Sequence, residues 1–155
     1  MSDRKTHQLV GTISGATRAG YISWNQPGFF METVGGGFGG YLASMLPDQL
    51  EPATSSWHRG ACHSLGAAGA VASMDKVLLE LAATCRAEAN KYRAIQTVQD
   101  PFTGEFRPVP IGFFQVLAEW FWSFLAGVLN GLSVGYLSHL ALDACTPRSI
   151  PLLGA

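Results

Sequence analysis

The sequence predicts an all-α protein, folded as a compact bundle of four or five helices that pack closely through glycine-lined faces. Three observations predict this class. Small and apolar residues recur at intervals of three and four over most of the chain, which is the spacing of one helix face. Glycine and proline turn signals separate these stretches, and only residues 96–110 hold two short β-prone runs. The length of 155 residues predicts a single domain, residues 1–155.

The composition favours a protein that associates with a membrane, or one that buries most of its surface in its own core or against partners. Charged residues make up 14% of the chain, against about 25% in typical soluble domains, and the mean hydropathy is +0.19. The net charge of -1 gives no electrostatic reason to expect nucleic acid. The three cysteines are far apart and the first residues hold no apolar segment. We therefore expect neither a disulfide framework nor a cleavable signal peptide.

Two helices are expected first, over residues 5–19 and 31–46, with a turn at residues 25–28 between them. Each helix has small residues every four positions: Gly11, Gly15 and Ala19 in the first, and Gly35, Gly39 and Ala43 in the second. Such rows predict close approach by another helix. Residues 35–40 also match the pattern GxGxxG. No strand precedes them, so helix packing is favoured over a dinucleotide-binding loop.

The segment 46–64, LPDQLEPATSSWHRGACHS, is predicted to be a loop because Pro47 and Pro52 both oppose helix. It holds four groups able to bind a metal or move a proton: Asp48, Glu51, His58 and His63. Oxygen and imidazole ligands together suit Zn²⁺ or Mn²⁺ better than Ca²⁺ or Cu⁺. An exposed polar connector is the alternative interpretation of this segment taken alone.

Residues 61–73 are small and apolar and are predicted to be helical, and residues 74–94 form the clearest amphipathic helix. The apolar face of that helix is Val77, Leu78, Leu81, Ala82 and Cys85. The charged residues near its end are interpreted as a solvated face: Arg86, Glu88, Lys91 and Arg93. Residues 96–110 break the helical pattern around a turn at residues 100–104, which predicts either a small exposed hairpin or a loose loop.

Residues 111–144 form one long apolar run. Its window 120–138 carries no formal charge, which is just enough for a membrane span of about 20 residues. Glycines and Asn130 dilute its hydrophobicity, so a buried central helix is the competing interpretation. Four aromatic residues near its start would suit a bilayer interface or a partner groove: Trp120, Phe121, Trp122 and Phe124.

The last histidine lies in this apolar run. His139 and Asp143 are four residues apart and share a helix face, and a row of glycines at positions 127, 131 and 135 leads up to them. His7 precedes Gly11 and Gly15 at the same spacing. If the first and last helices pack on each other, His7 and His139 face one cavity, and the loop from Asp48 to His63 could close it. A metal or a His–Asp hydrogen bond would then satisfy these polar groups.

The segments LPDQLEPATSSWHRGACHS and GYLSHLALDACTPRSIPLL resemble the two signature motifs of the membrane-bound metal-dependent hydrolases, the LexA-regulated YdjM-like family. Seven residues match motif positions one by one: His7, Asp48, Glu51, His58, His63, His139 and Asp143. Ser149 departs from the pattern, because a glycine is common there. The resemblance implies that the seven residues converge in one cavity and hold divalent metal, Zn or Mn, as one ion or two.

The resulting functional hypothesis is a membrane-associated hydrolase that acts on a phosphoester or lipid-like substrate through metal-activated water. Asp48 and Glu51 are the candidate catalytic residues, as a bridge between ions or as a general base. Arg59 and Arg148 are candidates for holding a phosphate, and surface charge or helix capping is their alternative role. The expected location is the inner membrane, or the cytoplasm if the helix at 111–138 is buried in protein.

The alternative hypothesis is a non-catalytic membrane or assembly protein with a structural metal or none. Glycine-rich helices and low charge support it. A homo-oligomer or a protein partner would fit either hypothesis. Metal content separates the two, because a purified sample without Zn, Mn or Fe would favour the second.

Overall fold

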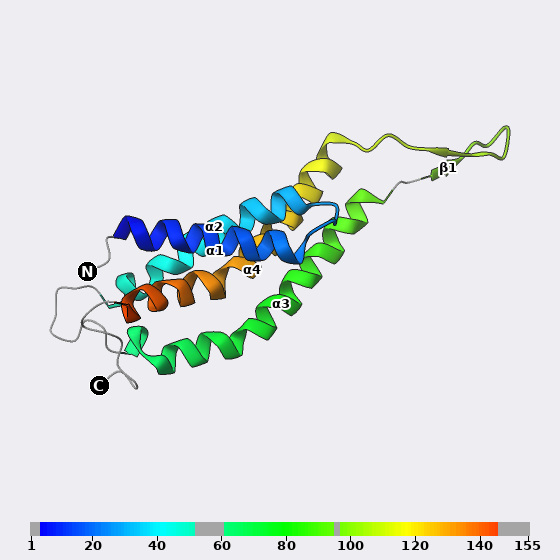
Figure 1. Cartoon of the computed structure of the whole chain (residues 1–155). Coiled ribbons are helices and arrows are strands. Elements are labelled where there is room, and N and C mark those ends of the chain that lie inside the picture. Colours follow the sequence, from blue (N-terminus) through cyan, green and yellow to red (C-terminus); the bar gives the residue numbers. More distant parts are fainter. Residues whose placement is uncertain (1–3, 52–60, 95–96, 146–155) are drawn as a thin grey trace.

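Four helices and one small hairpin make up the computed structural model, which describes residues 4–51, 61–94 and 97–145. The elements are α1 (Arg4–Ile22), α2 (Phe29–Leu50), the 3₁₀ turn η1 (Ala61–His63), α3 (Leu65–Arg93), β1 (Thr97–Gln99), β2 (Phe106–Pro108) and α4 (Phe113–Ala144). Successive helices run in opposite directions. The start of α1, the end of α2, the start of α3 and the end of α4 therefore lie at one end of the bundle (Figure 1). The predicted all-α fold is confirmed.

Helix α2 lies between α1 and α4 and touches both through its glycines. A methyl group added at Gly15 of α1 would come closer than 3.0 Å to the carbonyl of Gly36, and so would one added at Gly131 of α4. Gly40 is wedged in the same way between Gly11 and Gly135. The glycine rows of α1 and α4 thus meet α2 rather than each other. The reason is that α2 has small residues on more than one side, so it can accept a neighbour on each.

Helix α3 is a single helix of 29 residues, where the sequence suggested two segments. No proline interrupts residues 65–93. Its N-cap is Ser64, whose hydroxyl accepts a hydrogen bond from the backbone N–H of Ala67 at 3.1 Å. The hydrophobic residues Ala82 and Cys85 are buried against Ala126 of α4, whereas Val77 and Leu81 are about half exposed.

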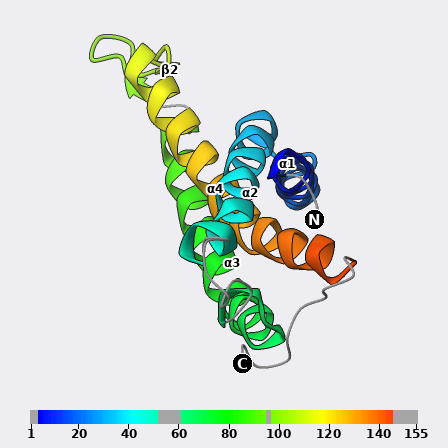
Figure 2. The same ribbon diagram turned by 90° about the vertical axis from the view of Figure 1, so that its left-hand side faces the viewer.

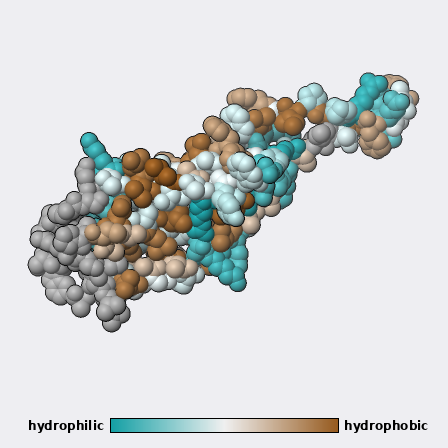
Figure 3. Space-filling model, in the orientation of Figure 1, coloured by the Kyte–Doolittle hydropathy of each residue, from teal (hydrophilic) through white to brown (hydrophobic). Residues whose placement is uncertain are grey.

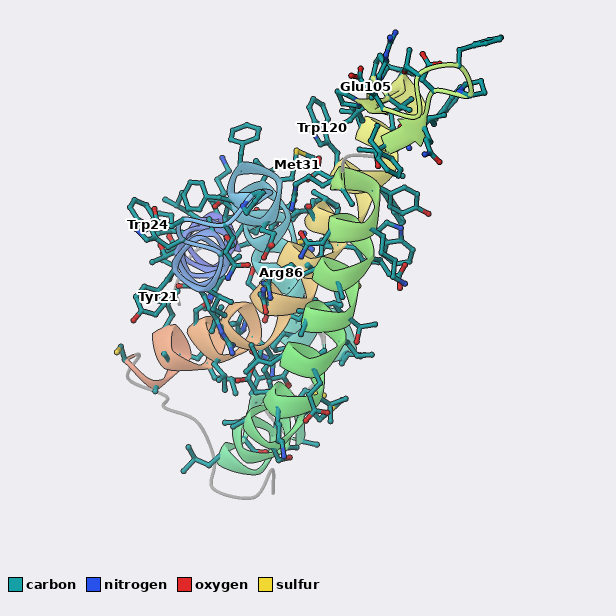
Figure 4. All side chains as sticks on the ribbon, turned by 90° about the vertical axis from the view of Figure 1, so that its right-hand side faces the viewer. Tyr21, Trp24, Met31, Arg86, Glu105 and Trp120 are labelled. Atoms are coloured by element: carbon teal, nitrogen blue, oxygen red, sulfur yellow. The ribbon has the colours of Figure 1, made fainter. Side chains whose placement is uncertain are left out.

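The charged residues of α3 only partly form the solvated face that the sequence suggested: Lys76, Glu80 and Lys91 are exposed, but two arginines are not. Arg86 donates to both carboxylate oxygens of the fully buried Glu32 of α2, at 2.8 and 2.6 Å. Arg93 pairs with Glu119 of α4. Figure 4 shows Arg86 on the side of α3 that faces the other helices. Arg86 and Arg93 therefore form ion pairs between helices. The sequence pattern did not predict these pairs, because the position of a charge on one helix does not show where its partner lies.

A third polar interaction links three helices. Arg18 of α1 donates to Asp75 of α3 at 2.7 and 2.6 Å and to the hydroxyl of Ser133 on α4 at 2.6 Å. Bidentate arginine–carboxylate pairs are the strong form of this interaction, since both hydrogen bonds are charge-assisted. Polar ties of this kind hold α3 on a bundle whose other three helices meet through glycine.

Pro47 lies inside α2, which continues to Leu50. The prediction that the segment from Leu46 is a loop was therefore wrong for its first residues. Proline costs a helix one donor and clashes with the preceding turn. The helix nevertheless continues through Pro47, whose carbonyl accepts a hydrogen bond from the backbone N–H of Glu51 at 2.9 Å. Asp48 consequently stands on a helix, and Glu51 is the residue that ends it.

The hairpin projects from the other end of the bundle (Figures 1 and 2). Its strands pair antiparallel, with Val98 opposite Arg107, and Gly104 in the connecting turn has φ +71°, which favours glycine. All six strand residues are exposed, so the hairpin adds nothing to the core. The hairpin alternative for residues 96–110 is confirmed. Hydrophilic and hydrophobic residues are mixed on the hairpin, whereas hydrophobic residues cover much of the bundle face seen in Figure 3.

Helix α4 is long and apolar enough to cross a membrane. Its 32 residues span about 48 Å at 1.5 Å per residue, against about 30 Å for a bilayer core. Half of its most apolar 18-residue window is buried inside the chain. The helix thus combines the two interpretations of its sequence, since it is long enough to span and also packs against the other three helices.

Candidate metal centre

Six of the seven predicted ligands come together where the four helix ends meet. His7 lies in the first turn of α1, Asp48 in the last turn of α2, Glu51 at the end of that helix, His63 in η1, and His139 and Asp143 in the last turns of α4. His58 lies outside the described residues, as do Arg59 and Arg148. These residues come from parts of the chain that are far apart in the sequence, and the antiparallel order of the helices brings them together.

The three described histidines form the centre of this cluster. The rings of His7 and His139 stack with their centroids 3.9 Å apart, and the ring of His63 meets His139 edge-on at 5.3 Å. His63 and His139 are fully buried. Burying imidazole without partners is costly, so each ring must be satisfied by the groups around it.

The hydrogen bond of His139 determines which nitrogen faces the cluster. Its Nδ1 lies 2.6 Å from the backbone carbonyl of Ser44, which can only accept, so Nδ1 carries the proton. In a neutral ring Nε2 then offers its lone pair to the cluster. A histidine fixed in this way by a backbone carbonyl is the usual arrangement of a metal ligand.

Four ligand atoms converge around this lone pair. His139 Nε2 lies 3.3 Å from His63 Nε2, 3.5 Å from Asp48 Oδ1 and 3.4 Å from Asp143 Oδ2. His63 Nε2 lies 3.3 Å from Asp48 Oδ1 and 3.7 Å from Asp143 Oδ2. A tetrahedral ion with ligands at about 2.0–2.1 Å separates them by roughly 3.3–3.4 Å. These five separations are close to that value, so the spacing suits an ion held by some of these atoms.

Asp143 faces two sides of the cluster at once. Its Oδ2 lies near His139 and His63, while its Oδ1 lies 3.7 Å from His7 Nε2. Two triads result, one of Asp48, His63 and His139 and one of His7, His139 and Asp143, and in each the ligand atoms lie within 4.8 Å of one another. A carboxylate in this position is able to bridge two ions about 4 Å apart. The sequence suggested Asp48 or Glu51 for that role; the geometry favours Asp143.

Glu51 contacts the far side of His63. One carboxylate oxygen accepts from the backbone N–H of Cys62 at 3.0 Å, and the other lies 3.1 Å from His63 Nδ1. Burial alone would raise the pKa of Glu51, but these hydrogen bonds bring it below its ordinary value. Burial likewise opposes protonation of His63, yet its hydrogen bonds to Asp48 and Glu51 hold the pKa of that imidazole above 6.5. The carboxylates of Asp48 and Glu51 thus favour the protonated form of the His63 imidazole.

Two groups in the site could not be expected from side-chain motifs. The carbonyl of Ser44 orients His139, and the hydroxyl of Tyr136 donates to the carbonyl of Cys62 at 2.6 Å, which ties α4 to the turn that holds His63. A backbone acceptor leaves no signal in the residue types. Tyr136 does lie three positions before His139, on a neighbouring part of the same helix face.

The donor set fits a divalent ion. It consists of imidazole nitrogens and carboxylate oxygens, which suit Zn²⁺ or Mn²⁺. No cysteine belongs to either triad in the part of the chain that the structure describes. In addition, His7 Nδ1 is buried with no hydrogen-bond partner among those residues, so the triad of His7, His139 and Asp143 contains a ring nitrogen without a partner.

A family model described as YdjM inner membrane protein matches residues 1–154. The chain belongs to the YdjM inner membrane protein family. The resemblance carried by the two motifs is thereby confirmed, and so is the inner-membrane location. No curated protein and no solved structure matches the chain. In this YdjM-family protein, α4 is the helix with the length and hydropathy of a membrane span within the described residues.

Proposed function

We propose that this YdjM-family protein is a metal-dependent hydrolase that cleaves a phosphoester at the inner membrane. The observation that carries the proposal is the convergence of His63 Nε2, His139 Nε2, Asp48 Oδ1 and Asp143 Oδ2 at separations of 3.3–3.7 Å. A bound Zn²⁺ or Mn²⁺ ion would lower the pKa of a coordinated water and polarise a phosphoryl oxygen.

The residues divide into holding and positioning roles. Asp48, His63 and His139 would hold one ion, and Asp143 would share it with a second position beside His7. Glu51 would orient His63 through Nδ1 rather than bind metal, because both of its oxygens are engaged on the far side of that ring. The sequence motif predicted Glu51 as a ligand, and its contacts favour the positioning role.

Asp48 is the member of the cluster that a substrate can reach. Its side chain is 34% exposed, whereas those of His63 and His139 are 0% exposed. The open side of the site therefore lies at the end of α2. Asp48 can accept a proton there as a general base while the buried histidines stay fixed.

Hydrolysis of bis(p-nitrophenyl) phosphate by the purified protein tests this proposal. We expect turnover that stops on chelation and returns on addition of Zn²⁺ or Mn²⁺. Asp143→Asn should abolish it. Ser138→Ala should not, because within the described residues the Ser138 hydroxyl donates to the carbonyl of Gly135 on its own helix. Tight metal binding without turnover of any phosphoester would overturn the catalytic proposal.

The alternative is a non-catalytic membrane protein in which the same residues form a structural site. Two ion pairs between helices, Glu32–Arg86 and Arg18–Asp75, lie outside the cluster. They show that charged groups inside this bundle can serve packing alone, which is compatible with a structural site. Metal that is bound at stoichiometric amount, with loss of helix packing on chelation and no hydrolysis, is the result expected for this function.

A further inference from the structure

A buried amide lies at the middle of α4. Asn130 is 1% exposed, and neither its oxygen Oδ1 nor its nitrogen Nδ2 has a hydrogen-bond partner within the described residues. Burying an amide without hydrogen bonds is costly, and asparagine is a weaker helix former than leucine or alanine. Neither packing nor helix propensity therefore explains an asparagine at this position, and a bound partner for the amide would explain it.

Two neighbours of Asn130 on its own helix show what surrounds the amide on one side. Residues three and four positions apart lie next to each other on a helix face. Ala126, four positions before Asn130, packs against α3. Gly127, three positions before it, lies so close to the backbone of Glu32 on α2 that an added methyl group would come nearer than 3.0 Å. The amide thus lies near the stretch of α2 and α3 that holds the Glu32–Arg86 ion pair.

Ser133, three positions after Asn130, shows what lies on the other side. Its hydroxyl accepts a hydrogen bond from Arg18 of α1 at 2.6 Å and donates one to Asp75 of α3. Arg18 and Asp75 also bond to each other, at 2.7 and 2.6 Å. Along α4, Asn130 therefore lies between two ion pairs that join different helices.

The chemistry of this place identifies the ligand that suits it. Oδ1 of Asn130 needs a hydrogen-bond donor, and Nδ2 needs acceptors. A metal cation would satisfy only Oδ1 and an anion only Nδ2, whereas a water molecule both donates and accepts. The two neighbouring ion pairs are each neutral overall, so they favour neither an anion nor a cation. Their carboxylate oxygens have lone pairs for more than one hydrogen bond each, which gives a water molecule further acceptors.

We propose that Asn130 binds a buried water molecule, which links the Glu32–Arg86 and Arg18–Asp75 pairs into one polar network through the middle of the bundle. All four helices contribute to this network. The site is separate from the metal cluster, because Asn130 precedes His139 by nine residues on α4, about 13 Å along the helix. The proposal does not depend on the proposed function.

Labelling with ¹⁵N-asparagine tests the water directly, because the chain has three asparagines, Asn25, Asn90 and Asn130. Asn25 and Asn90 are exposed, and Asn25→Gln and Asn90→Gln identify their side-chain signals. The remaining signals then belong to Asn130 in a chain unaltered at the site. In detergent, we expect its amide protons to exchange with D₂O at least about a hundredfold more slowly than those of the exposed pair. They should also show a nuclear Overhauser effect to water, with the sign of a bound molecule.

Three results of this experiment would overturn the proposal. Slow exchange with no Overhauser effect to water would show that the amide is buried and dry. Exchange as fast as that of the exposed asparagines would show that the amide is not enclosed. An Overhauser effect that disappears in Ser133→Ala would come from the exchanging hydroxyl proton of Ser133 rather than from a water molecule.

A matched pair of leucine substitutions gives a second readout. Asn130→Leu and Asn90→Leu both replace asparagine inside a helix, so both gain the same helix propensity. Asn90 is exposed and accepts a hydrogen bond from Arg93 at 2.6 Å. If water satisfies the Asn130 amide, Asn130→Leu expels the water and interrupts the network. Its Tm in detergent should then be about 2 °C or more below that of Asn90→Leu. If the amide is unpaired, leucine removes its cost, so an equal or higher Tm for Asn130→Leu would overturn the proposal. Should Asn130→Leu fail to fold, the labelling experiment decides the matter on the natural asparagine.

Discussion

His7 and His139 stack their imidazole rings with centroids 3.9 Å apart, so the first turn of α1 and the last turns of α4 share one buried site. Neither helix end could take this position unless both helices lay very close to α2. Glycine at the helix contacts provides that proximity, because carbonyl groups of α2 occupy the space that a side chain would need. The packing of the bundle and the geometry of the cluster therefore depend on each other.

Gly131→Ala should destabilise the bundle by about 1–3 kcal/mol, because the added methyl would meet the backbone of Gly36 closer than 3.0 Å. A backbone carbonyl cannot move aside as a flexible side chain can. Thermal unfolding in detergent, followed by circular dichroism, measures the change.

Gly69→Ala on α3 is the matched control. An added methyl there has nothing within 4 Å, so the substitution should stabilise the helix by about 0.5–1 kcal/mol. If the two alanine variants unfold at the same temperature, glycine-mediated packing does not hold this bundle together.

Arg86→Met should cost about 3–5 kcal/mol, because it leaves the fully buried carboxylate of Glu32 without its partner. Lys76→Met removes an exposed pair with Glu80 on the same helix and should change stability by less than about 0.5 kcal/mol. Chemical unfolding of the two variants side by side measures both. A small effect of Arg86→Met would mean that α3 does not depend on this tie.

The Arg18–Asp75 pair predicts a pH dependence. The hydrogen bonds from Arg18 hold the pKa of Asp75 below its ordinary 3.8, although burial opposes this. A carboxylate whose pKa is lowered by folding contributes its full stability above pH 3.8 and loses it as the pH falls through the folded value. Asp75→Asn should therefore be less stable than the unaltered protein at neutral pH, and the gap should narrow below pH 3.8. A gap that stays constant down to the lowest measurable pH would contradict the assignment.

Helix positions followed from the sequence because spacing reports which residues share a face. The rows at Gly11 and Gly131 predicted close packing correctly, but not that α2 stands between α1 and α4. Periodicity describes one helix at a time, and the choice of neighbour depends on all of them. Pro47 misled for a related reason, since the cost of a proline is a local preference that the packing of the whole helix can outweigh.

The residues of the cluster could also be named in advance, because they gather in one polar segment, extend the glycine rows and match the motif positions of the family. Their roles could not. The carbonyl of Ser44 fixes His139, and Glu51 contacts the far side of His63. Both contacts depend on where the folded backbone places these residues. Likewise, the internal pairing of Arg86 with Glu32 joins positions that no local pattern relates.

Glu51→Gln should weaken metal binding without abolishing it. The amide keeps an acceptor for Cys62 but loses the charge that supports His63, and changes in such supporting groups cost about 10–100-fold in metal affinity. Competition against a chelator of known affinity gives the number. Glu88→Gln, an exposed change on α3 that removes only a pair with Lys91, should leave the affinity unaltered. Complete loss of metal from Glu51→Gln would make Glu51 a direct ligand instead.

The metal content of the purified protein, measured by elemental analysis on the unaltered chain, His139→Ala and Ser138→Ala, tests the central claim most directly. We expect about one or two equivalents of Zn or Mn per chain in the unaltered protein and in Ser138→Ala. His139→Ala should retain the helical content but lose the metal, because His139 is a member of both triads. An unaltered protein that binds no Zn or Mn, even when either is supplied in excess, would contradict the metal centre.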